Sequence, residues 1–123
     1  MIRGSVSADG EAIIPLVVLD THGREHALQA IIDTGFSGFL TLPTAMIDAL
    51  ELPWLGRADA VLGDGALHEF DVFAATVFWD GQVRTVETDA ADVNPLVGMG
   101  LLRGYAIEIH VTEDGQVRIE ALP

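Results

Sequence analysis

Ile31-Ile32-Asp33-Thr34-Gly35 is the stretch on which the interpretation of this sequence depends. Two β-branched apolar residues are typical of the end of a buried strand, and Asp and Gly are typical of the sharp turn that follows. An Asp-Thr-Gly triplet occurs by chance in roughly one or two chains in a hundred of this length. Taken alone, the triplet also fits an ordinary surface turn. The flanking sequence therefore has to show whether it is such a turn or part of a functional site.

The sequence before Asp33 predicts a β-hairpin. Residues 11–20 and 25–32 are apolar and rich in β-branched side chains, and Thr21-His22-Gly23-Arg24 between them contains the glycine that tight turns favour. Both predicted strands lead toward Asp33, which would therefore follow the end of a strand.

The sequence after Gly35 predicts a short buried strand and then a helix. Phe39-Leu40-Thr41-Leu42 is the strand, and Pro43-Thr44 begins a helix that we expect to extend through Leu50, with Thr44 as its cap. The expected apolar stripe of this helix consists of Ala45, Met46, Ala49 and Leu50.

The rest of the chain is predicted to form strand pairs joined at turns that contain glycine. The pairs are residues 58–73 around Gly63-Asp64-Gly65, 74–79 with 82–87 around Asp80-Gly81, and 105–111 with 116–120 around Glu113-Asp114-Gly115. An acidic loop is expected from Glu87 to Asp92, and Met99 to Arg103 is predicted to form one turn of helix.

The two halves of the chain follow one pattern: a hairpin, two apolar residues, a turn with glycine, and a short helix. In the first half the turn follows Ile31-Ile32 and contains Asp33. In the second half it follows Leu96-Val97 and contains only Gly98. One chain thus offers one carboxylate at this place, and a second would have to come from another chain.

The composition predicts a single all-β domain over residues 1–123. Half of the residues are apolar, a fifth are charged, and no linker-like stretch divides the chain. Nineteen acidic residues against six arginines and no lysine leave a net charge of −13, so neither nucleic acid nor an anionic membrane is expected as a partner. The absence of cysteine excludes disulfides and thiolate nucleophiles.

The sequence shows no sign of membrane insertion or of a metal site. Met1 to Ser5 lacks a basic region followed by an apolar stretch, and the longest apolar run, Ala12 to Leu19, contains Pro15 and is too short to span a bilayer. We therefore expect a soluble, cytoplasmic protein. No metal is expected, because the spacing typical of metal ligands is lacking in His22, His26, His68 and His110. No cofactor is expected either.

In this context, the quoted stretch resembles the catalytic signature of aspartic proteases, and the order of segments from Glu11 to Ile109 resembles that of retropepsins. Asn94-Pro95-Leu96-Val97-Gly98-Met99-Gly100-Leu101-Leu102 is similar to the apolar-apolar-Gly and paired-leucine stretch near the end of that family. The resemblance implies a closed, barrel-like all-β fold with one or two short helices, assembled as a homodimer. It also implies an endopeptidase that acts on a peptide or protein substrate.

The resemblance assigns roles to Asp33, Thr34 and Gly35. Asp33 from each of two chains would supply one of two carboxylates that share a proton, one activating water and the other polarising the peptide carbonyl. Thr34 would form a hydrogen bond across the dimer. Gly35 would let the backbone turn where a Cβ would clash, and would bring its N–H close to the carboxylate.

The hairpin at Leu62, Gly63, Asp64 and Gly65 resembles the flap that closes over substrate in this family, with glycines giving mobility and room for an extended peptide. A plain structural hairpin is the alternative, because glycine-tipped hairpins are common in β proteins. Trp79 is expected to pack in the core. Trp54 is expected either to pack or to line a substrate pocket.

Two residues depart from the retropepsin pattern. Phe36 stands where retroviral members have Ala and pepsin-like members have Ser, and Ser37 is one position too late to match that serine. A bulky residue here resembles the small bacterial members. Met99 replaces an Arg that makes an intersubunit contact in retroviral members, so we expect different dimer contacts. These departures leave a second hypothesis open, a catalytically silent retropepsin-like module for dimerisation or protein binding.

Overall fold

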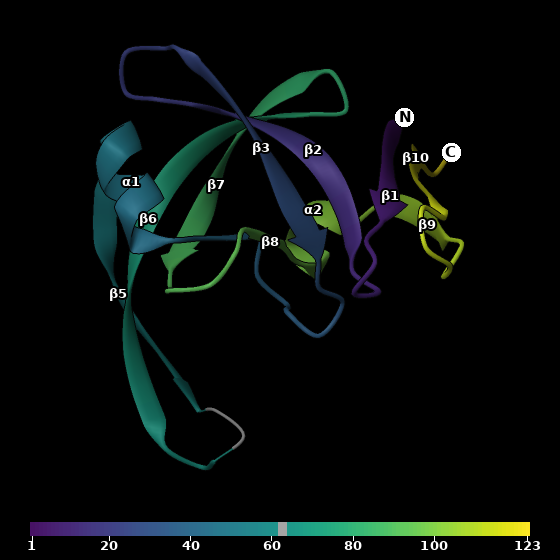
Figure 1. The fold of residues 1–123 in the computed structure, drawn as a ribbon. Helices are drawn as coiled ribbons and strands as arrows, with labels where there is room; N and C mark the ends of the chain where they lie inside the picture. The colour runs from purple at the N-terminus through teal and green to yellow at the C-terminus, as the bar shows by residue number, and fades with distance from the viewer. Residues whose placement is uncertain (62–63) are drawn as a thin grey trace.

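The described residues, 1–61 and 64–123, form ten strands and two short helices in a computed structural model of the chain (Figure 1). The strands are β1 (Ile2–Val6), β2 (Ala12–Leu19), β3 (Glu25–Ile32), β4 (Leu40–Leu42), β5 (Trp54–Val61), β6 (Leu67–Trp79), β7 (Gln82–Ala90), β8 (Leu96–Val97), β9 (Tyr105–Ile109) and β10 (Gln116–Ala121). The helices are α1 (Thr44–Leu50) and α2 (Met99–Leu102). The predicted all-β class with short helices is confirmed.

The strands form one mixed sheet that closes on itself. Their order is β5-β6-β7-β4-β8-β3-β2-β1-β10-β9, and β6 pairs in addition with β2, opposite Val17 to Leu19. This extra pairing joins β6, β7, β4, β8, β3 and β2 into a ring. Strand β5 extends the sheet outside the ring at one end, and β1, β10 and β9 extend it at the other. The predicted closed, barrel-like arrangement is therefore confirmed.

Among the described residues, the buried core is apolar apart from Thr41 and Thr88. Side chains alternate between the two faces of a strand, and the inward set in β6 is Ala75, Val77 and Trp79, each at most 1% exposed. The predicted packing role of Trp79 is confirmed. The helices contribute the buried residues Ile47, Leu50, Leu101 and Leu102. Among the described residues, no helix has the length and apolar character needed to cross a membrane.

Helix α1 differs from the prediction in its first residue and in its buried face. Pro43 has an extended backbone and precedes the helix, so Thr44 is the first helical residue and makes no side-chain cap bond. A helix of two turns turns few residues toward the core, and here they are Ile47 and Leu50. The predicted stripe is therefore right for Leu50, right in part for the half-buried Met46, and wrong for the exposed Ala45 and Ala49.

Three strands differ from the prediction because of pairing with distant segments. The stretch Leu67–Trp79 is one continuous strand, not two, since it pairs along its length with β5, β7 and β2. Strand β7 extends to Ala90 because Glu87 pairs with Ala74 and Asp89 with Val72, so the expected acidic loop begins later. Strand β1 is absent from the prediction, and it forms by pairing with β10.

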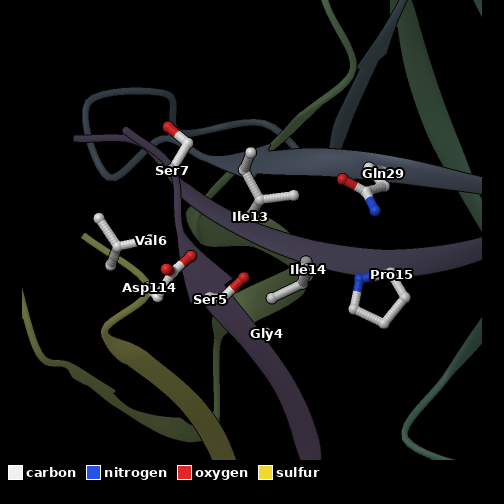
Figure 2. Close-up of a pocket in the computed structure, with 9 residues that line it drawn as sticks. All are labelled: Gly4, Ser5, Val6, Ser7, Ile13, Ile14, Pro15, Gln29 and Asp114. Carbon is white, nitrogen blue, oxygen red and sulfur yellow. The ribbon is translucent and has the colours of Figure 1, made fainter. Parts of the chain in front are cut away.

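Strand β1 approaches β2 closely at Gly4. The two strands pair only at Ser5↔Ile13 and Val6↔Ala12, and Figure 2 shows β1 leaving β2 beside Ile13. Pro15, which has no N–H to offer, lies farther along β2. A Cβ on Gly4 would overlap the carbonyl oxygen of Ile13. The crossing of these strands therefore requires glycine at this position.

We expect Gly4→Ala to lower the free energy of unfolding by about 1–3 kcal/mol, because β1 and β2 must move apart to admit the methyl group. Urea unfolding measures this change. The control is Ser5→Ala, at an exposed position on the same strand, which should change stability by less than about 0.5 kcal/mol. A Gly4→Ala protein as stable as the parent would contradict the close crossing.

Candidate active site

Asp33 directly follows the end of β3, at the place where β3 meets β8. These two strands pair in parallel through Ile31↔Leu96 and Ile32↔Val97. The two apolar pairs that the sequence shows in each half of the chain thus lie side by side. Asp33 and Gly98 follow these pairs and occupy equivalent positions in the two halves.

Residues 33–39, which we call the Asp33 loop, are held to residues 95–100 by backbone hydrogen bonds. The N–H of Asp33 donates to the carbonyl of Val97 at 2.9 Å. The N–H of Met99 donates to the carbonyl of Phe36 at 2.8 Å. The start and the middle of the loop are thus both fixed by the second half of the chain. Two further bonds run from Gly98 N–H to Phe39 O at 3.0 Å and from Gly100 N–H to Gly38 O at 2.9 Å.

The carboxylate of Asp33 is partly exposed and accepts one hydrogen bond in the described structure, from the N–H of Gly35 to Oδ1 at 3.0 Å. This is the contact that the sequence resemblance implied for Gly35. The expected clash of a Cβ at this position is supported, because a Cβ on Gly35 would lie 3.3 Å from Asp33 Oδ1, closer than most such contacts. The φ of Gly35 lies outside the left-handed region, so this crowding and not backbone strain favours glycine. Thr34 is exposed at the tip of this turn.

Asp33 has no acidic counterpart in the other half of the chain, because the equivalent position there is Gly98. A hollow of about 300 Å³ lies between β1 and β2, and Figure 2 shows its lining residues, which do not include Asp33. Asp33 itself is partly exposed. The turn at Gly98 therefore supplies no second carboxylate to pair with Asp33.

The hairpin formed by β5 and β6, which we call the arm, extends away from the barrel. Figure 1 shows the arm and the Asp33 loop projecting toward the same side of the molecule, at the bottom of the view. At the end of the arm, Asp64 Oδ1 accepts a hydrogen bond from the N–H of Ala66 at 2.9 Å, and Gly65 has a φ of 77°. The predicted flap residues Leu62 and Gly63 lie outside the described residues.

The base of the arm contains a polar cluster that the sequence prediction missed. Trp54 is 60% exposed, so its expected packing role is wrong, and its Nε1 donates to Asp71 Oδ1 at 3.1 Å. Arg57 lies 3.4 Å from Asp71 and 3.7 Å from Glu69. A bulge between Trp54 and Gly56 shifts the register here. Glycine inside an apolar strand was the available signal for this irregularity.

Each histidine of the chain faces one carboxylate. The pairs are His22–Glu51 at 3.1 Å, His26–Asp20 at 2.8 Å, His68–Asp64 at 3.6 Å and His110–Glu108 at 2.9 Å. Within the part of the chain that the structure describes, no three His, Asp or Glu side chains come together as a metal site.

Three carboxyl groups outside the Asp33 loop have shifted pKa values. The hydrogen bond from His26, with further bonds from the backbone N–H groups of Arg24 and His22, lowers the pKa of Asp20 to about 2 against the opposing effect of burial. Asp20 stabilises the β2–β3 turn in this way. The other shifts are a lowered pKa at Glu108, caused first by its hydrogen bond with His110, and a raised pKa at Asp89, caused by burial and by nearby Glu87.

The chain is similar to a crystal structure of a retropepsin-like aspartic protease from Rickettsia conorii. The two share a TM-score of 0.57 and 15% sequence identity, and the match covers 98% of this chain and 90% of that one. No protein-family model matches the chain, and a search of curated proteins found no match. The likeness shows a retropepsin-like fold, in agreement with the resemblance that the sequence shows.

The lowered pKa of Asp20 predicts how stability depends on acid. A carboxyl group whose folded pKa is below its unfolded value of 3.8 contributes stability above that pH and loses it as pH falls toward about 2. We therefore expect Asp20→Asn to be less stable than the parent at pH 5 and to lose less further stability between pH 4 and pH 2. Thermal unfolding across this range measures the difference, and parallel curves for the two proteins would contradict it.

Proposed function

We propose that the chain is an aspartic endopeptidase that acts as a homodimer, with one active site made from the Asp33 loops of two copies. The observation that carries this proposal is the single, partly exposed Asp33 carboxylate at the junction of β3 and β8, opposite a second-half turn that has only Gly98. A two-fold axis beside this loop would bring two Asp33 residues together. The retropepsin-like fold supports the same arrangement.

The proposed chemistry follows from two facing carboxylates. At about 3 Å separation both cannot be ionised, so one keeps a proton while the other does not. The ionised Asp33 takes a proton from water as the oxygen attacks the peptide carbonyl, and the protonated Asp33 donates to the carbonyl oxygen. The N–H of Gly35, 3.0 Å from Oδ1, holds each carboxylate in orientation.

The other parts of the chain take supporting roles in this proposal. The exposed hydroxyl of Thr34 is free to bond to the partner copy and hold the two loops together. The predicted flap residues Leu62, Gly63, Asp64 and Gly65 cover an extended peptide substrate, and Asp64 and Gly65 lie at the end of the described arm. Residues 1–123 act as one domain without metal or cofactor. We propose a cytoplasmic location, with which a chain that has no cysteine is compatible.

We expect Asp33→Asn to abolish peptidase activity, with a loss of at least about 10²- to 10⁴-fold in kcat/KM, because the amide cannot accept the proton of water. Cleavage of an extended peptide library measures the loss. Asp48→Asn, at an exposed position on α1, is the matched control and should retain activity. In mixtures, excess Asp33→Asn chains should suppress the parent, because mixed dimers have one carboxylate.

Two results would contradict this proposal. One is a species of a single chain mass, 13.1 kDa by sedimentation, that cleaves peptides. The other is full activity in Asp33→Asn. A parent protein that dimerises but cleaves no peptide between pH 3 and pH 8 would favour the silent dimerisation or binding module instead.

A further inference from the structure

The ring of Phe36 lies against two glycines that come from different halves of the chain. A Cβ on Gly38 would lie 2.5 Å from Cε1 of Phe36 and 2.6 Å from its Cζ. A Cβ on Gly98 would lie 2.5 Å from Cδ2 of the same ring. Side-chain carbons do not approach so closely, so the ring fills the volume that side chains at positions 38 and 98 would need.

The two glycines are not equivalent. Gly98 is crowded by backbone as well, because its Cβ would overlap the carbonyl oxygen of Gly38. Gly38 is crowded by Phe36, since the Phe36 ring supplies the three atoms nearest to a Cβ there, apart from the adjoining residues Ser37 and Phe39. The φ of Gly38 lies outside the left-handed region, so its backbone would accept alanine. The ring of Phe36 is thus the obstacle to alanine at position 38.

The backbone of Phe36 connects its ring to the carboxylate. Its N–H donates to the carbonyl of Asp33 at 3.2 Å and closes the turn that presents Asp33. Its carbonyl accepts from the N–H of Met99 at 2.8 Å. If the ring no longer packed between Gly38 and Gly98, the turn at Asp33 would therefore loosen at Phe36, the residue whose N–H closes it.

We propose that Phe36 is a positioning residue for Asp33, and that Gly38 is glycine because it admits the Phe36 ring. The ring joins the Asp33 loop to the turn at Gly98, as a side-chain contact in addition to the backbone hydrogen bonds. The effect on catalysis rests on the proposed function. The effect on the geometry of the Asp33 turn does not depend on the proposed function.

A double-mutant cycle of Phe36→Ala and Gly38→Ala tests this coupling through kcat and KM. Phe36→Ala should lower kcat on the order of 10- to 100-fold with KM nearly unchanged, because the carboxylate is less well oriented. In the parent, Gly38→Ala should lower kcat by a similar factor. Added to Phe36→Ala, it should lower kcat less than about twofold, since the obstructing ring is then gone. Phe36→Leu should fall between Phe36→Ala and the parent.

The matched control replaces Phe73, an aromatic residue of β6 that packs against the core. Gly38→Ala should cost the same factor in a Phe73→Ala chain as in the parent. Two results would overturn the proposal. One is a double variant in which the kcat losses of Phe36→Ala and Gly38→Ala multiply, and the other is an unchanged kcat in Phe36→Ala.

Amide exchange at Gly35 tests the positioning role independently of activity. Its N–H is bound to Asp33 Oδ1, so Phe36→Ala should speed its exchange at least about tenfold, while the amide of Ala74, bound to Pro53 O, should keep its protection. Unchanged exchange at Gly35 would overturn the positioning role even in an active enzyme. If the parent cleaves no peptide and Gly35 responds as expected, only the proposed function fails.

Discussion

The parallel pairing of β3 with β8 is the contact on which the candidate site depends. It joins Ile31-Ile32 to Leu96-Val97 across the two halves of the chain, and it lies within the ring that β2 and β6 close. Asp33 is the first residue beyond it. Because the ends of two buried strands define this position, the carboxylate is held by the barrel, and the hydrogen bonds of the Asp33 loop then refine its direction.

The same pairing places a carboxylate on only one of two equivalent turns. The two half-chains present equivalent turns, but only the first contains a carboxylate, and the second contributes Gly98, one of the two glycines that receive Phe36, and the backbone groups that bind the loop. The second half thus acts as a support for the first. The proposed dimer restores the missing carboxylate by symmetry, with the same Asp33 used twice.

Local patterns in the sequence predict much of the fold, and distant contacts account for the rest. The β2–β3 hairpin and the Asp80-Gly81 turn, with φ values of 51° and 79°, follow from residues that are neighbours in sequence. Strand β1 could not be predicted, because its partner β10 lies at the other end of the chain. The packing of Phe36 could not be predicted either. Its size departs from the retropepsin pattern, and the room for its ring depends on Gly38 and Gly98.

An active site shared by two chains, as proposed, would bind one peptide for every two chains. Calorimetric titration with an uncleavable peptide, in which a hydroxyl-bearing carbon replaces the scissile amide, measures the number of sites directly, since such a group occupies the place of the tetrahedral intermediate. We expect saturation at one peptide for every two chains and no binding to Asp33→Asn chains. Saturation at one peptide per chain, or equal binding to the Asp33→Asn protein, would contradict it.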